Sequence, residues 1–362
     1  MSKLLFLVHG MGSNPAHWSD SLRDKLDEVA SRYSAFAGGA AKFSQRVTLC
    51  EIRYDGVFEE KVQQWQADAA ELDKWSQTAG RPLPKIVQWL RTTMPREDAK
   101  NFFWSTAVDP LLYRGFQLVR DEVRANVMAQ IVSCLTTNMA GGAADACVLS
   151  HSLGTAVMHD ALHQLGSQPY QGNESFIATR FKFQSFFMLA DVCMLGPHGL
   201  LDIDYFNSVV RPVIAGNERT YCQFFFNAWH QFDPFVLSGP FRPTTWGDRY
   251  REIGPLQHFH QANIHGLVHY LDHPAVHVPI INASLGFQAI PVKESQDALA
   301  NYPLIGSPEC SAQIQKLKEL AKEFENAGED LEELVIKIAE FYAAAKQLGE
   351  ECKGMAGSAL IA

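Results

Sequence analysis

The sequence contains no long apolar run, no cluster of basic residues and no pair of cysteines spaced as C-x-x-C. The first apolar run, residues 4–8, is too short for a signal-peptide core or a membrane span. Acidic side chains outnumber basic ones by 40 to 31, and the formal net charge of -9 disfavours contact with phosphate backbones. We therefore expect a cytoplasmic protein with no integral membrane segment and no nucleic-acid partner.

The seven cysteines are scattered along the chain, and several have apolar neighbours, as Cys147 and Cys222 do. Their odd number and irregular spacing do not match a disulfide framework. In a reducing compartment such thiols stay free. We therefore expect buried, unpaired cysteines with no redox or zinc-binding role.

The chain does have 362 residues, 47% of them hydrophobic, which is enough for one large domain or two ordinary ones. Short apolar runs are separated by helical patterns. This arrangement predicts an α/β protein with a mostly parallel central sheet flanked by helices. The expected strands are residues 4–8, residues 47–52, a run ending at residue 150, and residues 186–195, 222–226 and 256–264.

Two regions carry more helical pattern than such a sheet needs. The spacing from residue 58 to 135 exceeds one crossover helix, so we interpret residues 58–110 as an inserted helical cap. Its aromatic side chains form the core of the cap or line an apolar acyl pocket. After residue 308, two amphipathic stripes predict a helical hairpin that packs on the core or on a second subunit. We predict a domain over residues 1–307 and an extension over 308–362, with homo-oligomerisation through the extension as one possibility.

The most informative segment is VLSHSLGTAV, residues 148–157. A buried strand leads into a sharp turn, with Ser152 at its tip, and then into a helix. Small residues, Ser150 and Gly154, lie two positions before and after Ser152, as a strained nucleophile turn requires. The segment is a G-x-S-x-G turn in which serine replaces the first glycine. It predicts that Ser152 is a nucleophile.

A serine nucleophile needs hydrogen-bond donors for the oxyanion that forms on its substrate. The first strand is followed by HGMG, residues 9–12, where glycines let backbone N–H groups turn toward a ligand. We predict that the N–H groups of Met11 and Leu153 are the donors; a plain glycine turn is the alternative. The supporting residues would be His9, Gly10, Gly12 and Gly154.

A serine nucleophile also needs a histidine to accept its proton and an acid to orient that histidine. Asp233 follows the apolar run at 222–226 and precedes a proline, which holds it in an extended or turn conformation. His265 precedes a glycine and opens a short helical segment. We predict Asp233 as the acid, with Asp191 as the alternate. We predict His265 as the base, with His269 as the alternate.

Four histidines, at positions 265, 269, 273 and 277, have the spacing of one helix face. Pro274 excludes His273 from a continuous helix, so one helix cannot present all four. His258 and His260 could share the face of a strand, but they have no nearby cysteine or carboxylate set. We predict no metal site and no cofactor.

The chain order Ser152, Asp233, His265 is the order found in α/β-hydrolases. The sequence resembles the lipase and esterase branch of that superfamily at residues 4–12, 150–154, 233–234 and 265–271. The resemblance implies an α/β-hydrolase fold, a Ser-Asp-His triad that works without a cofactor, and hydrolysis of a carboxylic ester. The sequence departs from the family in two places. Ser150 replaces the first glycine of the nucleophile motif, and the helical insertion precedes Ser152, whereas many lipases carry their cap after the nucleophile.

The resulting hypothesis is a serine hydrolase that forms an acyl-enzyme on a small-molecule or lipid ester. The aromatic content favours an apolar or aryl ester. A phospholipase or a thioesterase would use the same triad. A protein of this fold that only binds a ligand or partner is the alternative from a different class.

Overall fold

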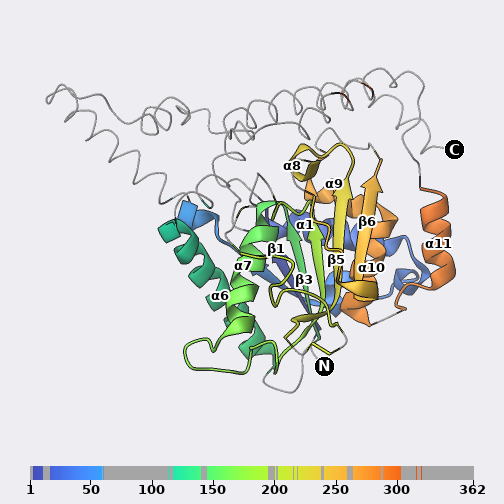
Figure 1. Ribbon diagram of the computed structural model, residues 1–362. Coiled ribbons are helices and arrows are strands. Elements are labelled where there is room, and N and C mark those ends of the chain that lie inside the picture. The colour runs from blue at the N-terminus through green and yellow to red at the C-terminus, as the bar shows by residue number, and fades with distance from the viewer. Residues whose placement is uncertain are drawn as a thin grey trace, which may run out of the picture.

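The structure is a computed structural model with one central sheet (Figure 1). It describes residues 3–10, 17–58, 60, 113, 117–139, 145–194, 200, 203–214, 216–217, 219–237, 240–258, 264–286, 288–302, 315 and 319. The six strands are all parallel, in the order β2-β1-β3-β4-β5-β6. They are β1 (Lys3–Val8), β2 (Thr48–Ile52), β3 (Asp145–His151), β4 (Phe183–Leu189), β5 (Cys222–His230) and β6 (Tyr250–Leu256). The expected α/β class with a parallel sheet is confirmed.

Helices cover both faces of the sheet (Figure 1). On one face, α6 (Gln117–Met139) and α7 (Leu153–Ser167) share a core with Phe6 and Val8 of β1. On the other face, α1 (Ser19–Ser31), α9 (Leu267–Asp272) and α10 (Pro274–Leu285) pack with Leu5 and Leu7. Successive side chains of a strand point to opposite faces, so the continuous run in β1 supplies both cores. The described residues also form α2 (Phe43–Arg46), α8 (Pro234–Leu237), α11 (Val292–Ala300) and the 3-10 turns Ser34–Phe36 and Gly247–Arg249.

The strand predictions hold best for the first half of the chain. β1, β2 and the strand before Ser152 lie where they were expected. β4 ends earlier than predicted because the chain turns at Ala190, which has a φ of 50°. The strand predicted at 256–264 overlaps β6 (Tyr250–Leu256) only at Leu256: residues 257, 258 and 264 are not in a strand, and residues 259–263 lie outside the described residues. Most of the side chains of β6 are exposed or half-buried. An edge strand of this kind leaves no apolar run in the sequence.

The helix pattern before the serine is confirmed in α6. Its buried residues Val119, Val123, Val127 and Ile131 recur every four positions, as an amphipathic helix requires. Most of the predicted cap (58–110) and extension (308–362) lies outside the described residues. Within the described part of the chain, no helix has the length and apolar character needed to cross a bilayer.

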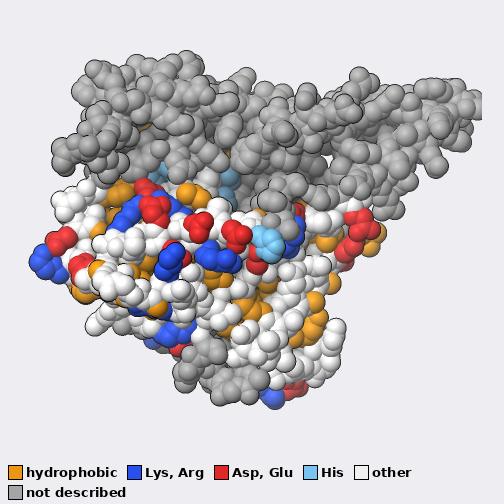
Figure 2. Space-filling view, turned by 180° about the vertical axis from the view of Figure 1, so that it is seen from behind, with side chains coloured by type: hydrophobic (Ala, Val, Ile, Leu, Met, Phe, Trp, Pro, Cys, Tyr) orange, Lys and Arg blue, Asp and Glu red, His pale blue; other side chains and the backbone are white. Residues whose placement is uncertain are grey.

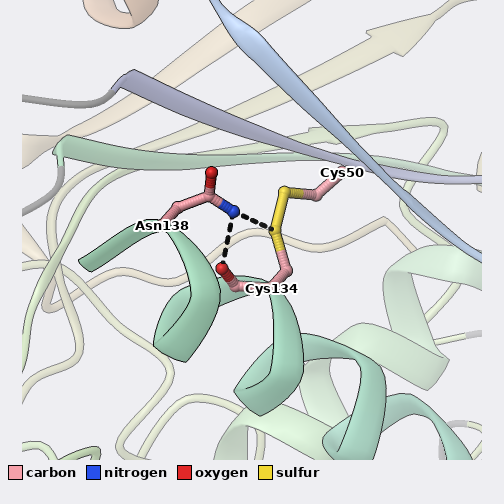
Figure 3. The surroundings of a disulfide bond; sticks show 3 residues. All are labelled: Cys50, Cys134 and Asn138. Carbon is pink, nitrogen blue, oxygen red and sulfur yellow. Dashed lines mark hydrogen bonds between the residues drawn. A yellow bond between two sulfur atoms is a disulfide. The ribbon is translucent and has the colours of Figure 1, made fainter. Parts of the chain in front are cut away.

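One pair of cysteines contradicts the expectation of free thiols. Cys50 of β2 and Cys134 of α6 form a disulfide, and Asn138 donates to the Cys134 carbonyl at 2.8 Å (Figure 3). The two residues are 84 positions apart, so their pairing depends on how α6 packs beside β2 and not on local spacing. Cys147, Cys193 and Cys222 are free and buried, as predicted.

The surface carries charges of both signs. On the face shown in Figure 2, acidic and basic side chains lie next to one another. Lys25 of α1 and Arg32, the residue directly after α1, each form an ion pair with Glu28, and both also pair with Asp272 at the end of α9. These pairs link the two helices that cover the same face of the sheet.

Candidate active site

Ser152 occupies the turn between β3 and α7. Its backbone has a φ of 55° and a ψ of -132°, a conformation that costs a residue with a side chain of the order of 1–3 kcal/mol. Hydrogen bonds hold the turn: the Ser152 N–H donates to the Leu189 carbonyl at 3.0 Å, and the Thr155 hydroxyl donates to the Ser152 carbonyl at 2.7 Å. Strain maintained at one serine by its surroundings is typical of a functional residue.

Gly154 is required by the way this turn packs. A Cβ atom at position 154 would lie 2.2 Å from the His9 carbonyl oxygen and 3.1 Å from Val8 Cγ1. The first turn of α7 therefore contacts the backbone at the end of β1 directly. Ser150, the other small residue of the motif, is fully buried in β3.

The chain after β1 passes against the serine. A Cβ atom at Gly10 would lie 2.9 Å from Ser152 Cβ. The Tyr54 hydroxyl donates to the carbonyls of His9 (2.8 Å) and Gly10 (3.0 Å), and His9 Nδ1 donates to the Gly10 carbonyl at 2.7 Å. Leu153 is buried and is the first residue of α7, so its N–H lies at a helix N-terminus. Met11 and Gly12 lie outside the described residues.

The structure brings the predicted serine, histidine and aspartate together. His265 Nε2 lies 2.7 Å from Ser152 Oγ, and His265 Nδ1 lies 2.9 Å and 2.8 Å from the two carboxylate oxygens of Asp233. Asp233 follows β5, and His265 lies between β6 and α9. All three side chains are buried. Since the carboxylate accepts from Nδ1–H, the neutral imidazole presents its Nε2 lone pair to the serine hydroxyl.

The electrostatics of Asp233 suit a charged acid. Burial alone would raise the pKa of its carboxyl group, but attraction to His265 and hydrogen bonds from His265 and Tyr270 outweigh burial and lower that pKa below its usual value. Phe235 N–H also donates to Oδ1, at 3.1 Å. The carboxylate therefore stays ionised beside the histidine that it orients.

The two alternates do not take part in this arrangement. Asp191 follows β4, and its Oδ1 accepts from the Cys193 N–H at 2.9 Å. Burial raises the pKa of the Asp191 carboxyl group. His269 lies in α9 and directs Nε2 to the His258 carbonyl at 3.1 Å. Neither residue has a hydrogen bond to Ser152 or His265 among the contacts of the described residues.

Two residues of this site were not found from the sequence. His151, directly before Ser152, donates from Nε2 to the His265 carbonyl at 2.6 Å, and burial lowers the pKa of its imidazole to about 3. The Tyr270 hydroxyl donates to Asp233 Oδ2 at 2.7 Å. The position of His151 inside the nucleophile motif was a usable signal, but nothing local marks Tyr270 because its contact joins two distant segments.

Three buried histidines form a separate group between the end of β5 and α9. His230, His258 and His269 each offer a ring nitrogen within 4.8 Å of the others. The rings of His258 and His269 stack at 4.1 Å and 12°, so their in-plane lone pairs do not meet at one ion. Each of the three donates from Nε2 to a backbone carbonyl at 2.8–3.1 Å. This geometry favours a structural role, in which the three imidazoles hydrogen-bond to the backbone, over a metal site.

The predicted break at Pro274 is confirmed, and it separates the other histidines. α9 ends at Asp272 and α10 begins at Pro274, with His273 as its N-cap. His265 lies before α9, so the four regularly spaced histidines do not share a helix face. His260 lies outside the described residues.

The hydrogen-bonded chain from Ser152 through His265 to Asp233 can take a proton from the serine hydroxyl and return it to a leaving group. Comparison with known proteins gives no further guide, since no family model, no curated protein and no solved structure matches the chain.

Proposed function

We propose that this protein is a serine hydrolase of the α/β-hydrolase fold that cleaves a carboxylic ester. One observation carries the proposal: Ser152, His265 and Asp233 form a continuous hydrogen-bonded chain at a strained strand–turn–helix. The elements that carry them support the fold assignment. The nucleophile, the acid and the base follow β3, β5 and β6 of a parallel sheet, in the chain order that α/β-hydrolases use.

In the proposed reaction, Ser152 Oγ attacks the ester carbonyl while its proton moves to His265 Nε2. The carbonyl oxygen becomes an oxyanion that the Leu153 N–H would bind, with the Met11 N–H as the expected second donor. His265 then gives the proton to the leaving alcohol, and the acyl group remains on Ser152. Water attacks the acyl-enzyme with His265 as base, which releases the acid. Asp233 stabilises the charged imidazole in both steps.

The first test is covalent labelling with a fluorophosphonate, which reacts with an activated serine. The wild-type protein should be labelled on Ser152, and Ser152→Ala should not be labelled. Asp233→Asn should lose most of the turnover, of the order of 10⁴-fold, because the amide stabilises the wrong tautomer of His265. A wild-type protein that neither reacts with the probe nor hydrolyses any ester would contradict the proposal and favour a binding role.

Substrate class is the second measurement. Rates on aryl esters, short and long alkyl esters, thioesters and phospholipids, each corrected by the Ser152→Ala protein, would rank the substrates. The proposal expects an apolar or aryl carboxylic ester to give the highest kcat/KM. If a thioester or a phospholipid gives the highest kcat/KM, the proposed triad stands and the proposed substrate class is replaced.

A further inference from the structure

The hydroxyl of Tyr270 donates to Asp233 Oδ2 at 2.7 Å, and both side chains have an exposed fraction of 0%. Solvent therefore does not compete for this hydrogen bond at the carboxylate. A hydrogen bond to a charged group is stronger than one between neutral groups, and burial strengthens it further. The Tyr270 hydroxyl therefore stabilises the same carboxylate that accepts a hydrogen bond from His265, and this places Tyr270 where it can affect the triad.

A second contact fixes the orientation of the hydroxyl. Tyr270 Oη accepts from the His230 backbone N–H at 3.1 Å, so its proton is directed to Asp233. Tyr270 belongs to α9, which follows His265, and His230 ends β5, which precedes Asp233. One side chain thus connects the segment that carries the base to the segment that carries the acid.

We propose that Tyr270 is a positioning residue of the triad, whose hydroxyl holds the Asp233 carboxylate in the plane and direction that His265 requires. The inference rests on the proposed function. Asp233 Oδ1 is held by the Phe235 N–H and Oδ2 by Tyr270, while both oxygens contact His265 Nδ1. Without Tyr270, Oδ2 would lose the donor that opposes rotation of the carboxylate about its Cβ–Cγ bond.

The same hydrogen bond tunes the strength of the acid. Burial and the neighbouring Asp233 charge raise the pKa of the Tyr270 phenol well above its usual value, so it stays a neutral donor at every working pH. Its hydrogen bond lowers the pKa of Asp233. Removing the donor makes the carboxylate more basic. A more basic carboxylate holds a proton in the hydrogen-bonded chain more tightly, so the acid limb of the kcat/KM profile should move to higher pH.

The test compares two tyrosine-to-phenylalanine variants of the full-length chain. Tyr270→Phe removes the donor to Asp233. Tyr221→Phe is the matched control, because Tyr221 is equally buried and its hydroxyl donates to the Phe176 carbonyl at 2.5 Å, away from the triad. Melting temperature, kcat, KM and the pH profile of kcat/KM would be measured for each on the best ester.

We expect Tyr270→Phe to lower kcat about tenfold with little change in KM, and to move the acid limb of kcat/KM upward by about 0.5–1 pH unit. Tyr221→Phe should lose stability and leave both kinetic quantities unchanged. An acid limb that stays at the wild-type pH in Tyr270→Phe would overturn the inference, as would equal losses in the two variants.

Failure of the positioning role and failure of the proposed function give different results. If wild-type protein is labelled at Ser152 and turns over esters while Tyr270→Phe behaves like Tyr221→Phe, only the positioning role fails. If Tyr270→Phe does not fold, a fluorinated tyrosine placed at position 270 keeps the hydroxyl and makes it a stronger donor. The acid limb should then move to lower pH, and an unchanged limb would overturn the inference.

Discussion

Mild acid should unfold this protein, because it buries several histidines in their neutral form. Burial, ahead of every other cause, lowers the pKa of His151, His159 and His230 to about 3 and that of His277 to about 4. In the unfolded chain the same groups titrate near 6.5. Between these values the unfolded state binds protons that the folded state cannot, so the stability is complete above about pH 6.5 and falls as the pH drops.

The size of the effect follows from the difference in bound protons. Each of the four groups removes about 1.4 kcal/mol per pH unit below 6.5, which amounts to about 2 kcal/mol per group at about pH 5. Together they remove about 8 kcal/mol from the free energy of unfolding, against a typical total of about 5–15 kcal/mol. The raised pKa of Asp191 has the opposite effect, because it favours the folded state in acid. It is a single group, and the four histidines outweigh it.

The assay is urea unfolding at a series of pH values from about 7.5 down to 5, with the free energy of unfolding plotted against pH. The slope counts the protons taken up on unfolding. His159→Gln should reduce the slope by the contribution of one titrating group, because its imidazole is fully buried. A wild-type slope no larger than that of one titrating group would refute the reasoning.

Two further predictions concern packing and the disulfide. Gly154→Ala should cost about 1–3 kcal/mol and most of the ester turnover, because a Cβ atom would lie 2.2 Å from the His9 carbonyl oxygen. Gly56→Ala, where nothing lies within 4 Å, should keep the turnover and should not lower the free energy of unfolding. Cys134→Ser should lower the free energy of unfolding by about 4–5 kcal/mol, the chain-entropy value for a loop of this length. A thiol reductant should lower the melting temperature of wild type and not of Cys134→Ser; equal shifts in both would exclude the disulfide as the cause.

The sequence allowed the local parts of the site to be predicted, because their signals are local. The turn at Ser152 needs a strand before it, a helix after it and small residues around it, and all of these lie within ten positions. Candidates for the acid and the base could be ranked because each was expected to follow a strand, in the chain order of α/β-hydrolases. Asp233 and His265 ranked above Asp191 and His269 on this criterion, and in the structure His265 lies between Ser152 and Asp233 with a hydrogen bond to each.

What the sequence could not predict depends on contacts through space. Tyr270 meets Asp233 only because α9 returns across the end of β5, and Cys50 meets Cys134 only because α6 packs beside β2. No spacing rule encodes either contact. β6 was misplaced for a different reason: prediction of a strand from apolar residues requires burial, and most of the side chains of β6 are exposed or half-buried.

The polarity of β6 also affects how the protein behaves at high concentration. β6 is the last strand of the described sheet, and a bare strand edge invites pairing with a strand from another molecule. The exposed side chains of Arg251 and Glu252 carry charge along this strand, and Pro255 has no N–H to offer to a partner strand. The charged and proline residues of β6 therefore disfavour pairing of this edge with a strand from another molecule, and so disfavour aggregation. The same residues are the reason why β6 contains no apolar run.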